Sequence, residues 1–313
     1  MSVVHIFGNG FDINLDLATD YPSFLRKYTA TEAESSAISK FKEAISNNIK
    51  QWSDLEHKLG EYTAAISDET EFDLIFEDIS DQLKEYLLDI ENTVIKAKDF
   101  KHLNSDVFMN HLKEPDFFLA DELRNRVWEI LGKVTERKIS LITFNYTRTV
   151  EILYPNLNLE VIHVHGDLDQ DIVMGVNDIN QIRNGKFRNS LDVREALVKP
   201  ECNSIMQRQQ HLAGIEKIKA AKLVCLFGVS LGDTDRLWWE LIKNEVENRE
   251  LEVILFWKTK EGELNKDYKI GRIHRAAKQR LHGNPEIQIT DALDTRVHVI
   301  VDSDIFSPKG ADV

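Results

Sequence analysis

Short apolar runs that end at polar turns are the feature of this sequence that most restricts its fold. The first run spans residues 3–7, stops at Gly8 and has no polar face, as expected of a buried parallel strand. Further strands are predicted at residues 139–144, 159–164, 172–176, 222–227, 252–257 and 296–301, and helices at 203–220, 234–247 and 265–282. Alternating strands and helices predict an α/β fold, a doubly wound, mostly parallel sheet of Rossmann-like type.

The segment between the first two predicted strands has helical periodicity throughout. Apolar side chains recur every three or four positions from Phe72 to Val94 and again from Phe118 to Val134, as on one face of a helix. We therefore predict a large all-helical insertion or cap at residues 30–137. Residues 1–29 and 138–313 are predicted to form the α/β domain.

Composition and charge restrict the classes of partner. The chain has 313 residues and is 42% hydrophobic, enough for a sizeable core. Its formal charge of −14 repels phosphate backbones, so nucleic acid is not expected as the main partner. No apolar stretch approaches the ~20 residues that cross a bilayer, and no basic leader is evident, so we expect a cytoplasmic protein without a membrane partner. Two cysteines exclude a disulfide scaffold or a four-cysteine zinc module, and no metal is predicted.

Four polar motifs directly follow predicted strands. They are Gly8-Asn9-Gly10-Phe11-Asp12, Asn145-Tyr146-Thr147, His165-Gly166-Asp167 and Gly228-Val229-Ser230-Leu231-Gly232-Asp233. Because the carboxyl ends of parallel strands lie along one edge of a sheet, all four motifs are expected on the same rim. Open parallel sheets bind their ligands at this rim.

The two glycine-containing motifs suit a phosphate group. Gly8 and Gly10 permit a tight turn and a close approach of the backbone to phosphate, although the six-residue glycine fingerprint is incomplete. Gly228, Ser230 and Gly232 can present backbone N–H groups and a hydroxyl, and Asp233 or the next residue can cap the helix that follows. A plain tight turn and a capped helix start are the alternatives.

Asn145 and His165 are the candidates for chemistry. The Asn145 amide can orient a ribose hydroxyl or a water molecule, or it can bond its own backbone. His165 titrates near neutrality and can act as a general base, or it can be structural. His163, two residues earlier, is expected to share the face of His165. A metal site would need a third ligand, which the sequence does not supply.

Two acidic motifs have competing interpretations. Ser53 and Glu56 fit the spacing of a helix capping box, although Glu56 can instead face the cleft. Asp167, Asp169 and Asp171 alternate, which suits either a metal-binding cluster or a solvated turn.

The motifs, taken in order, resemble the AbiH family of bacteriophage abortive-infection proteins. The resemblance spans about residues 3 to 245 and rests on Gly8 to Asp12, Tyr21 to Leu25, Trp52 to Glu56, Phe144 to Thr147, His163 to Gly166 and Ser230 to Asp235. It implies an antiviral role in abortive infection, a defence against bacteriophages. A phage-derived trigger or partner protein and further copies of this chain are the protein partners that we consider.

The same order is remotely similar to sirtuin-type NAD-binding domains. The matching positions are Gly8 and Gly10, Thr143 and Asn145, His165 and Gly166, and Gly228 and Ser230. Thr147 stands where sirtuins carry an aspartate, and the four zinc cysteines are absent. The resemblance therefore implies a sirtuin-like NAD hydrolase rather than a zinc-dependent deacylase.

The combined resemblances imply an effector that binds the dinucleotide NAD and hydrolyses its nicotinamide–ribose bond, with Asn145 and His165 as catalytic residues. They also imply a set of dinucleotide-binding residues: Gly8, Asn9, Gly10, Phe11, Asp12, Thr143, Thr147, Gly166, Gly228, Ser230, Gly232 and Asp235. A non-catalytic nucleotide-binding sensor and a metal-dependent nuclease effector are the alternatives.

Overall fold

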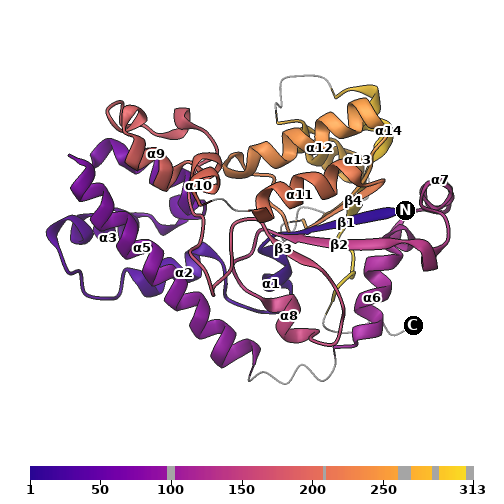
Figure 1. Ribbon diagram of the computed structural model, residues 1–313, viewed down its shortest axis with the longest axis horizontal. Coiled ribbons are helices and arrows are strands. Elements are labelled where there is room, and N and C mark those ends of the chain that lie inside the picture. Colours follow the sequence, from indigo (N-terminus) through magenta and orange to yellow (C-terminus); the bar gives the residue numbers. More distant parts are fainter. Residues whose placement is uncertain (97–102, 207–208, 260–268, 284–288, 308–313) are drawn as a thin grey trace.

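A six-stranded parallel sheet forms the centre of the molecule (Figure 1). The structure is a computed structural model that describes residues 1–96, 103–206, 209–259, 269–283 and 289–307. The strands are β1 (Ser2–Phe7), β2 (Lys138–Thr143), β3 (Val161–His163), β4 (Leu223–Phe227), β5 (Glu252–Trp257) and β6 (Val297–Val301). Their order is β3-β2-β1-β4-β5-β6, with parallel pairing throughout. This order is that of doubly wound Rossmann-like sheets, and it confirms the predicted fold class.

The position of β1 determines where the polar turns meet. β1 pairs with β2 on one side and β4 on the other, and Phe7 at its end lies opposite Thr143 and Phe227. The chain first extends the sheet outward to β3 and then returns to β4 beyond β1. Such a reversal is a topological switch point, where loops diverge and leave a crevice. The turns after β1, β2 and β4 therefore lie side by side.

Alternate side chains of β1 enter two separate hydrophobic cores. Val3 and Phe7 belong to one core, and Val4 and Ile6 belong to the other. The second core is covered by α11 (Gln209–Ala220), α12 (Arg236–Arg249), α13 (Ile270–His282) and α14 (Asp291–Arg296). The first is covered by α1 (Gly10–Asn14), α6 (Ser105–Lys113), α7 (Asp121–Leu131) and α8 (Thr149–Leu153). Because the sheet is buried on both faces, its strands are continuous runs of apolar residues.

The described residues between β1 and β2 contain helices and no strand, as the periodicity predicted. The further helices there are α2 (Tyr21–Tyr28), α3 (Ser36–Asn47), α4 (Leu55–Tyr62) and α5 (Glu69–Asp89), which continues as a π-helix over Ile90–Ile95. Figure 1 shows α3 and α5 beside α9 (Leu191–Leu197) and α10 (Lys199–Ile205), on the left of the view. The rings of Phe72 and Phe187 lie 5.8 Å apart, so residues after β3 pack against this helical part. The domain boundaries at residues 29 and 137 stay a prediction.

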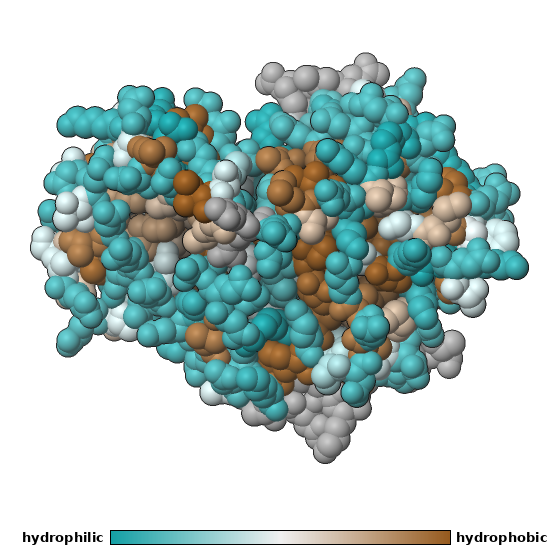
Figure 2. Space-filling view, in the orientation of Figure 1, coloured by the Kyte–Doolittle hydropathy of each residue, from teal (hydrophilic) through white to brown (hydrophobic). Residues whose placement is uncertain are grey.

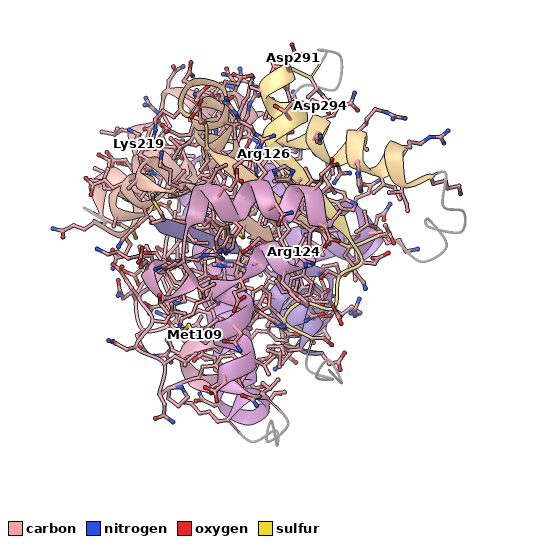
Figure 3. The ribbon with its side chains drawn as sticks, turned by 90° about the vertical axis from the view of Figure 1, so that its right-hand side faces the viewer. Met109, Arg124, Arg126, Lys219, Asp291 and Asp294 are labelled. Atoms are coloured by element: carbon pink, nitrogen blue, oxygen red, sulfur yellow. The ribbon has the colours of Figure 1, made fainter. Side chains whose placement is uncertain are left out.

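The helix α7 covers one end of the sheet (Figure 3). Its Arg126 donates a hydrogen bond of 2.6 Å to the buried Glu252 of β5, which also binds His298 of β6 at 2.6 Å. The buried Glu252 and His298 thus satisfy each other on the neighbouring strands β5 and β6. Most of the face in Figure 2 is hydrophilic, and hydrophobic residues gather beside the middle of the sheet-containing part.

The predicted strand at residues 172–176 is wrong. Val173, Met174 and Val176 are buried, so this run has the same apolar signal as a strand. It forms only an isolated bridge between Val176 and Val198, because Gly175 brings the backbone against Leu197. The predicted helix at 203–220 is also interrupted: α10 ends at Ile205 and α11 begins at Gln209. Residues 265–268 of the third predicted helix lie outside the described residues.

Two predicted helix caps are wrong as well. The side chain of Asp54, not Ser53, caps α4 and accepts a 3.1 Å hydrogen bond from the His57 N–H. Asp233 does not cap α12, because a short 3-10 helix (Asp233–Asp235) precedes it and makes no side-chain cap. Asp54 and Asp233 both line the cleft at the end of the sheet.

We predict that Gly175→Ala destabilises the protein. A Cβ atom at this position would lie 2.0 Å from the Leu197 carbonyl oxygen, so the backbone would have to shift. We expect the free energy of unfolding to fall by about 1–3 kcal/mol, measured by urea denaturation. Gly185→Ala is the control, because a Cβ there meets no atom within 4 Å. Equal losses in the two variants would contradict this account.

Candidate functional site

A cleft of about 1600 Å³ opens at the carboxyl ends of β1 and β4, and all four polar motifs contribute to its walls. The predicted residues that line it are Gly8, Asn9, Gly10, Asp12, Asn145, Thr147, His165, Gly228, Ser230, Gly232 and Asp235. Residues distant in sequence therefore meet at the switch point of the sheet.

Three residues of the predicted set do not line the cleft. The ring of Phe11 is buried and stacks on Phe7, with centroids 4.6 Å apart. The Thr143 hydroxyl accepts a hydrogen bond of 3.1 Å from the Asn145 N–H, so it shapes the turn. Gly166 has a φ of 79°, and its N–H is bonded to the His163 carbonyl at 3.2 Å. These residues support the motifs, and their contact with a ligand stays a prediction.

The glycines of the first and fourth motifs fit against each other. The Gly10 N–H donates to the Gly228 carbonyl at 2.9 Å, and the Gly8 N–H donates to Phe227 at 3.0 Å. A Cβ atom on Gly10 would lie 2.5 Å from the Gly228 Cα atom. The close contact between the two backbones thus explains why these positions are glycine. The N–H groups of Gly8 and Gly10 already donate hydrogen bonds within the protein.

The fourth motif offers unused backbone donors instead. Within the described part of the chain, the N–H groups of Val229, Ser230, Leu231 and Gly232 have no hydrogen-bond acceptor. Gly228 and Leu231 have φ angles of 68° and 53°, so left-handed residues interrupt this turn. Turns of this type can direct successive N–H groups toward an anion.

Asp12 is completely buried at the start of α1. The Thr147 hydroxyl donates a 2.5 Å hydrogen bond to its Oδ2 atom. Burial raises the pKa of Asp12 to about 6, and hydrogen bonds from Thr147, Thr149, Asn145 and Thr19 oppose this rise. Thr147 therefore has an internal partner, and it joins the turn after β2 to the turn after β1.

Asn145 presents a polar atom without a partner. Its Oδ1 atom is buried, the residue lines the cleft, and this oxygen has no hydrogen-bond partner among the described residues. A buried acceptor without a donor is unfavourable. A hydroxyl or water molecule that enters the cleft would satisfy it.

Four ionisable side chains form a network at the wall of the cleft. His165 Nε2 lies 2.9 Å from Asp235 Oδ1, and Lys199 Nζ lies 2.8 Å from the same oxygen. Lys199 Nζ also lies 2.8 Å from Glu56 Oε2. The side chains come from the turn after β3, the 3-10 helix before α12, the start of α10 and α4. Lys199 is not among the residues predicted from the sequence, because a single lysine at a helix start carries no motif.

Burial and charge act on these groups in opposite directions. Burial raises the pKa of Glu56 to about 7, although the Lys199 ammonium lowers it. Burial also disfavours the charged form of Asp235, but Lys199 and His165 outweigh it and hold that pKa well below its usual range. Burial would lower the pKa of Lys199, and the two carboxylates raise it instead. Lys199 is therefore an ammonium ion held between two acids.

His163 does not belong to this network, contrary to the expectation that it shares the face of His165. Its ring nitrogens lie 3.0 Å from the Asn145 carbonyl oxygen and 2.8 Å from Glu151 Oε1. The alternating aspartates also lie elsewhere, because Asp167, Asp169 and Asp171 do not line the cleft. Within the described residues, no three or more His, Cys, Asp or Glu side chains form a group that could hold a metal ion.

A doubly wound parallel sheet with a polar cleft at its switch point is characteristic of α/β ligand-binding proteins. Residues 4–257 match the family model "Bacteriophage abortive infection AbiH", and the chain belongs to this family. Membership in the AbiH family implies a role in abortive infection, a defence against bacteriophages. Comparison with curated proteins gives no match. No described helix has the length and hydropathy needed to span a membrane.

We predict that Asp12→Asn changes the pH dependence of stability. The pKa of Asp12 is about 6 in the folded protein against an ordinary value of 3.8, so Asp12 is the more protonated in the folded state. Its contribution to the free energy of unfolding is therefore largest at low pH and is lost as pH rises through about 6. Wild type should lose about 1.5 kcal/mol more than Asp12→Asn between about pH 5 and pH 8.

This difference can be measured by thermal unfolding across the pH range, with Asp81→Asn as the control because Asp81 is an exposed acid on α5. Identical pH profiles for wild type and Asp12→Asn would contradict the assignment.

Proposed function

We propose that this chain is an antiphage effector that binds NAD in the cleft and hydrolyses the nicotinamide–ribose bond. The observation that carries the proposal is the presence of Asn145 and His165 in one cleft with both glycine motifs, at the switch point of the sheet. The cleft volume of about 1600 Å³ is ample for a dinucleotide.

The diphosphate is assigned to the fourth motif. The N–H groups of residues 229–232 are unused, whereas those of Gly8 and Gly10 are bonded within the protein. Lys258 and Arg280 line the same cleft, and the Arg280 guanidinium lies 5.5 Å from the centroid of the Trp257 ring. Local donors and these cations would offset the acidity of the chain near the phosphates.

The reactive end is assigned to Asn145 and His165. In the proposed reaction, the bond between the ribose C1′ and the nicotinamide nitrogen breaks, and nicotinamide leaves as a neutral molecule with the bonding electrons. The oxygen of a water molecule forms the new bond to C1′, and His165 accepts a proton from that water. Asn145 Oδ1 accepts a hydrogen bond from a ribose hydroxyl or from the water. The nearby carboxylates favour the cationic sugar of the transition state.

A non-catalytic sensor is the second candidate function. His165 is only 4% exposed and is bonded to Asp235, so the same contacts also suit a structural histidine. In this case the cleft binds the nucleotide without turnover, and the helical part transmits binding to a partner.

The two functions differ in the fate of NAD. We expect wild-type protein, with phage components added where activation is needed, to release nicotinamide. Asn145→Ala and His165→Ala should reduce the rate by about 100-fold or more, because each removes a group that acts on the reacting atoms. Chromatography follows nicotinamide, and calorimetry follows NAD binding. His274→Gln is the control, because His274 is a partly exposed residue of α13 that lies outside the cleft.

Full activity of His165→Ala would reject this histidine as the base. Tight binding of NAD that stays intact with wild type under every condition would favour the sensor.

A further inference from the structure

We propose that Lys199 is a positioning residue that keeps His165 neutral, and so able to accept a proton, by sharing the carboxylate oxygen to which His165 is bonded. This inference rests on the proposed function of His165, and it assigns a role to a residue that no polar motif marks. It follows from the geometry of Asp235.

Asp235 Oδ1 has two donors. His165 Nε2 lies at 2.9 Å and Lys199 Nζ at 2.8 Å, and the side chains are 4% and 6% exposed. An imidazole bonded to an uncompensated, buried carboxylate is favoured in its cationic form, and an imidazolium cannot accept a proton. An ammonium at the same oxygen compensates the carboxylate charge. The arrangement thus preserves the orientation that Asp235 gives the ring without stabilising the imidazolium as strongly.

Glu56 and the backbone keep the ammonium in place. Glu56 Oε2 lies 2.8 Å from Lys199 Nζ, while Glu56 Oε1 accepts hydrogen bonds from the Tyr146 hydroxyl and the Gly175 N–H, both at 3.3 Å. The Lys199 N–H donates to the Val176 carbonyl at 2.8 Å. The lysine is therefore fixed at both its side chain and its backbone.

The same short segment holds His165. The Val173 N–H donates to the His165 carbonyl at 2.8 Å, three residues before the Val176 bridge that anchors Lys199. Residues 173–176 thus bond to the backbones of both partners of Asp235. This connection supports a positional role for Lys199 and not an accidental contact of a long side chain.

Two further described residues lie beside His165, and neither carries a positive charge near pH 7. His211 on α11 interacts electrostatically with His165, but burial lowers the pKa of His211 to about 4, so it is neutral near pH 7. Phe144 contacts the imidazole with ring centroids 5.2 Å apart and carries no charge. Asp54 is a further acid near Glu56 and adds negative charge to the network. Lys199 supplies the positive charge at the oxygen that binds His165.

The test is a proton NMR titration of the histidine rings, with His165→Gln used to assign the His165 signal. We expect Lys199→Met to move the His165 midpoint about one to three pH units upward, because Asp235 is then uncompensated. Lys199→Arg keeps a cation, so its His165 midpoint should lie much closer to the wild-type value than that of Lys199→Met. An unchanged midpoint in folded Lys199→Met would overturn the proposal.

If Lys199→Met does not fold, Glu56→Gln provides the test. This variant retains Lys199 and Asp235 but removes one carboxylate from the network, so the His165 midpoint should move downward. An upward shift or no shift would overturn the proposal. The titration needs no NAD, so its result stands even if the chain releases no nicotinamide. Where nicotinamide is released, the acidic limb of the pH–rate profile of Lys199→Met should move upward with the midpoint. A purely structural lysine would instead lower the rate at every pH.

Discussion

The contact between the backbones of Gly10 and Gly228 is the constraint on which the site depends. It joins the loops after β1 and β4 through a hydrogen bond of 2.9 Å, and this approach leaves no room for a Cβ atom on either residue. The contact fixes the first turn of α1, and with it the position of Asp12. It also fixes the start of the turn at 229–232, whose N–H groups are unused. The glycines thus build the cleft, and other atoms provide its donors.

The second constraint is electrostatic. In this acidic chain, the Lys199 ammonium lies between the buried Glu56 and the partly buried Asp235. Removing one partner of such a buried group leaves an uncompensated charge, which is strongly unfavourable. Glu56 comes from α4 in the helical part between β1 and β2, and Lys199 comes from the start of α10, whereas His165 and Asp235 follow strands β3 and β4. The network therefore makes the chemistry at the sheet depend on the packing of the helices.

The sheet and the convergence of its polar turns could be predicted from the sequence, because both follow from local patterns and from the geometry of parallel strands. Residues 172–176 could not be distinguished from a strand, since a buried loop has the same apolar composition. For Gly8 and Gly10 the sequence predicts a phosphate contact but not their contact with the backbone of Gly228, because a glycine required by a close backbone contact has the same sequence signal as a glycine required by a ligand. Lys199 was missed since its partners lie 36 and 143 positions away. Such pairings arise only from the tertiary structure.

The charge state of the network connects the two candidate functions. A base must be neutral before the reaction, whereas a structural histidine can be neutral or cationic without consequence. Placing a buried ammonium on the oxygen that binds His165 costs desolvation energy, and a structural role for the histidine would not require it. The Asn145 oxygen, which lacks a donor among the described residues, is a second costly feature, in the turn after β2. A bound ligand with hydroxyl groups would satisfy this oxygen under either candidate function. The ammonium beside His165 is therefore the feature that favours the proposed catalysis over the proposed simple binding.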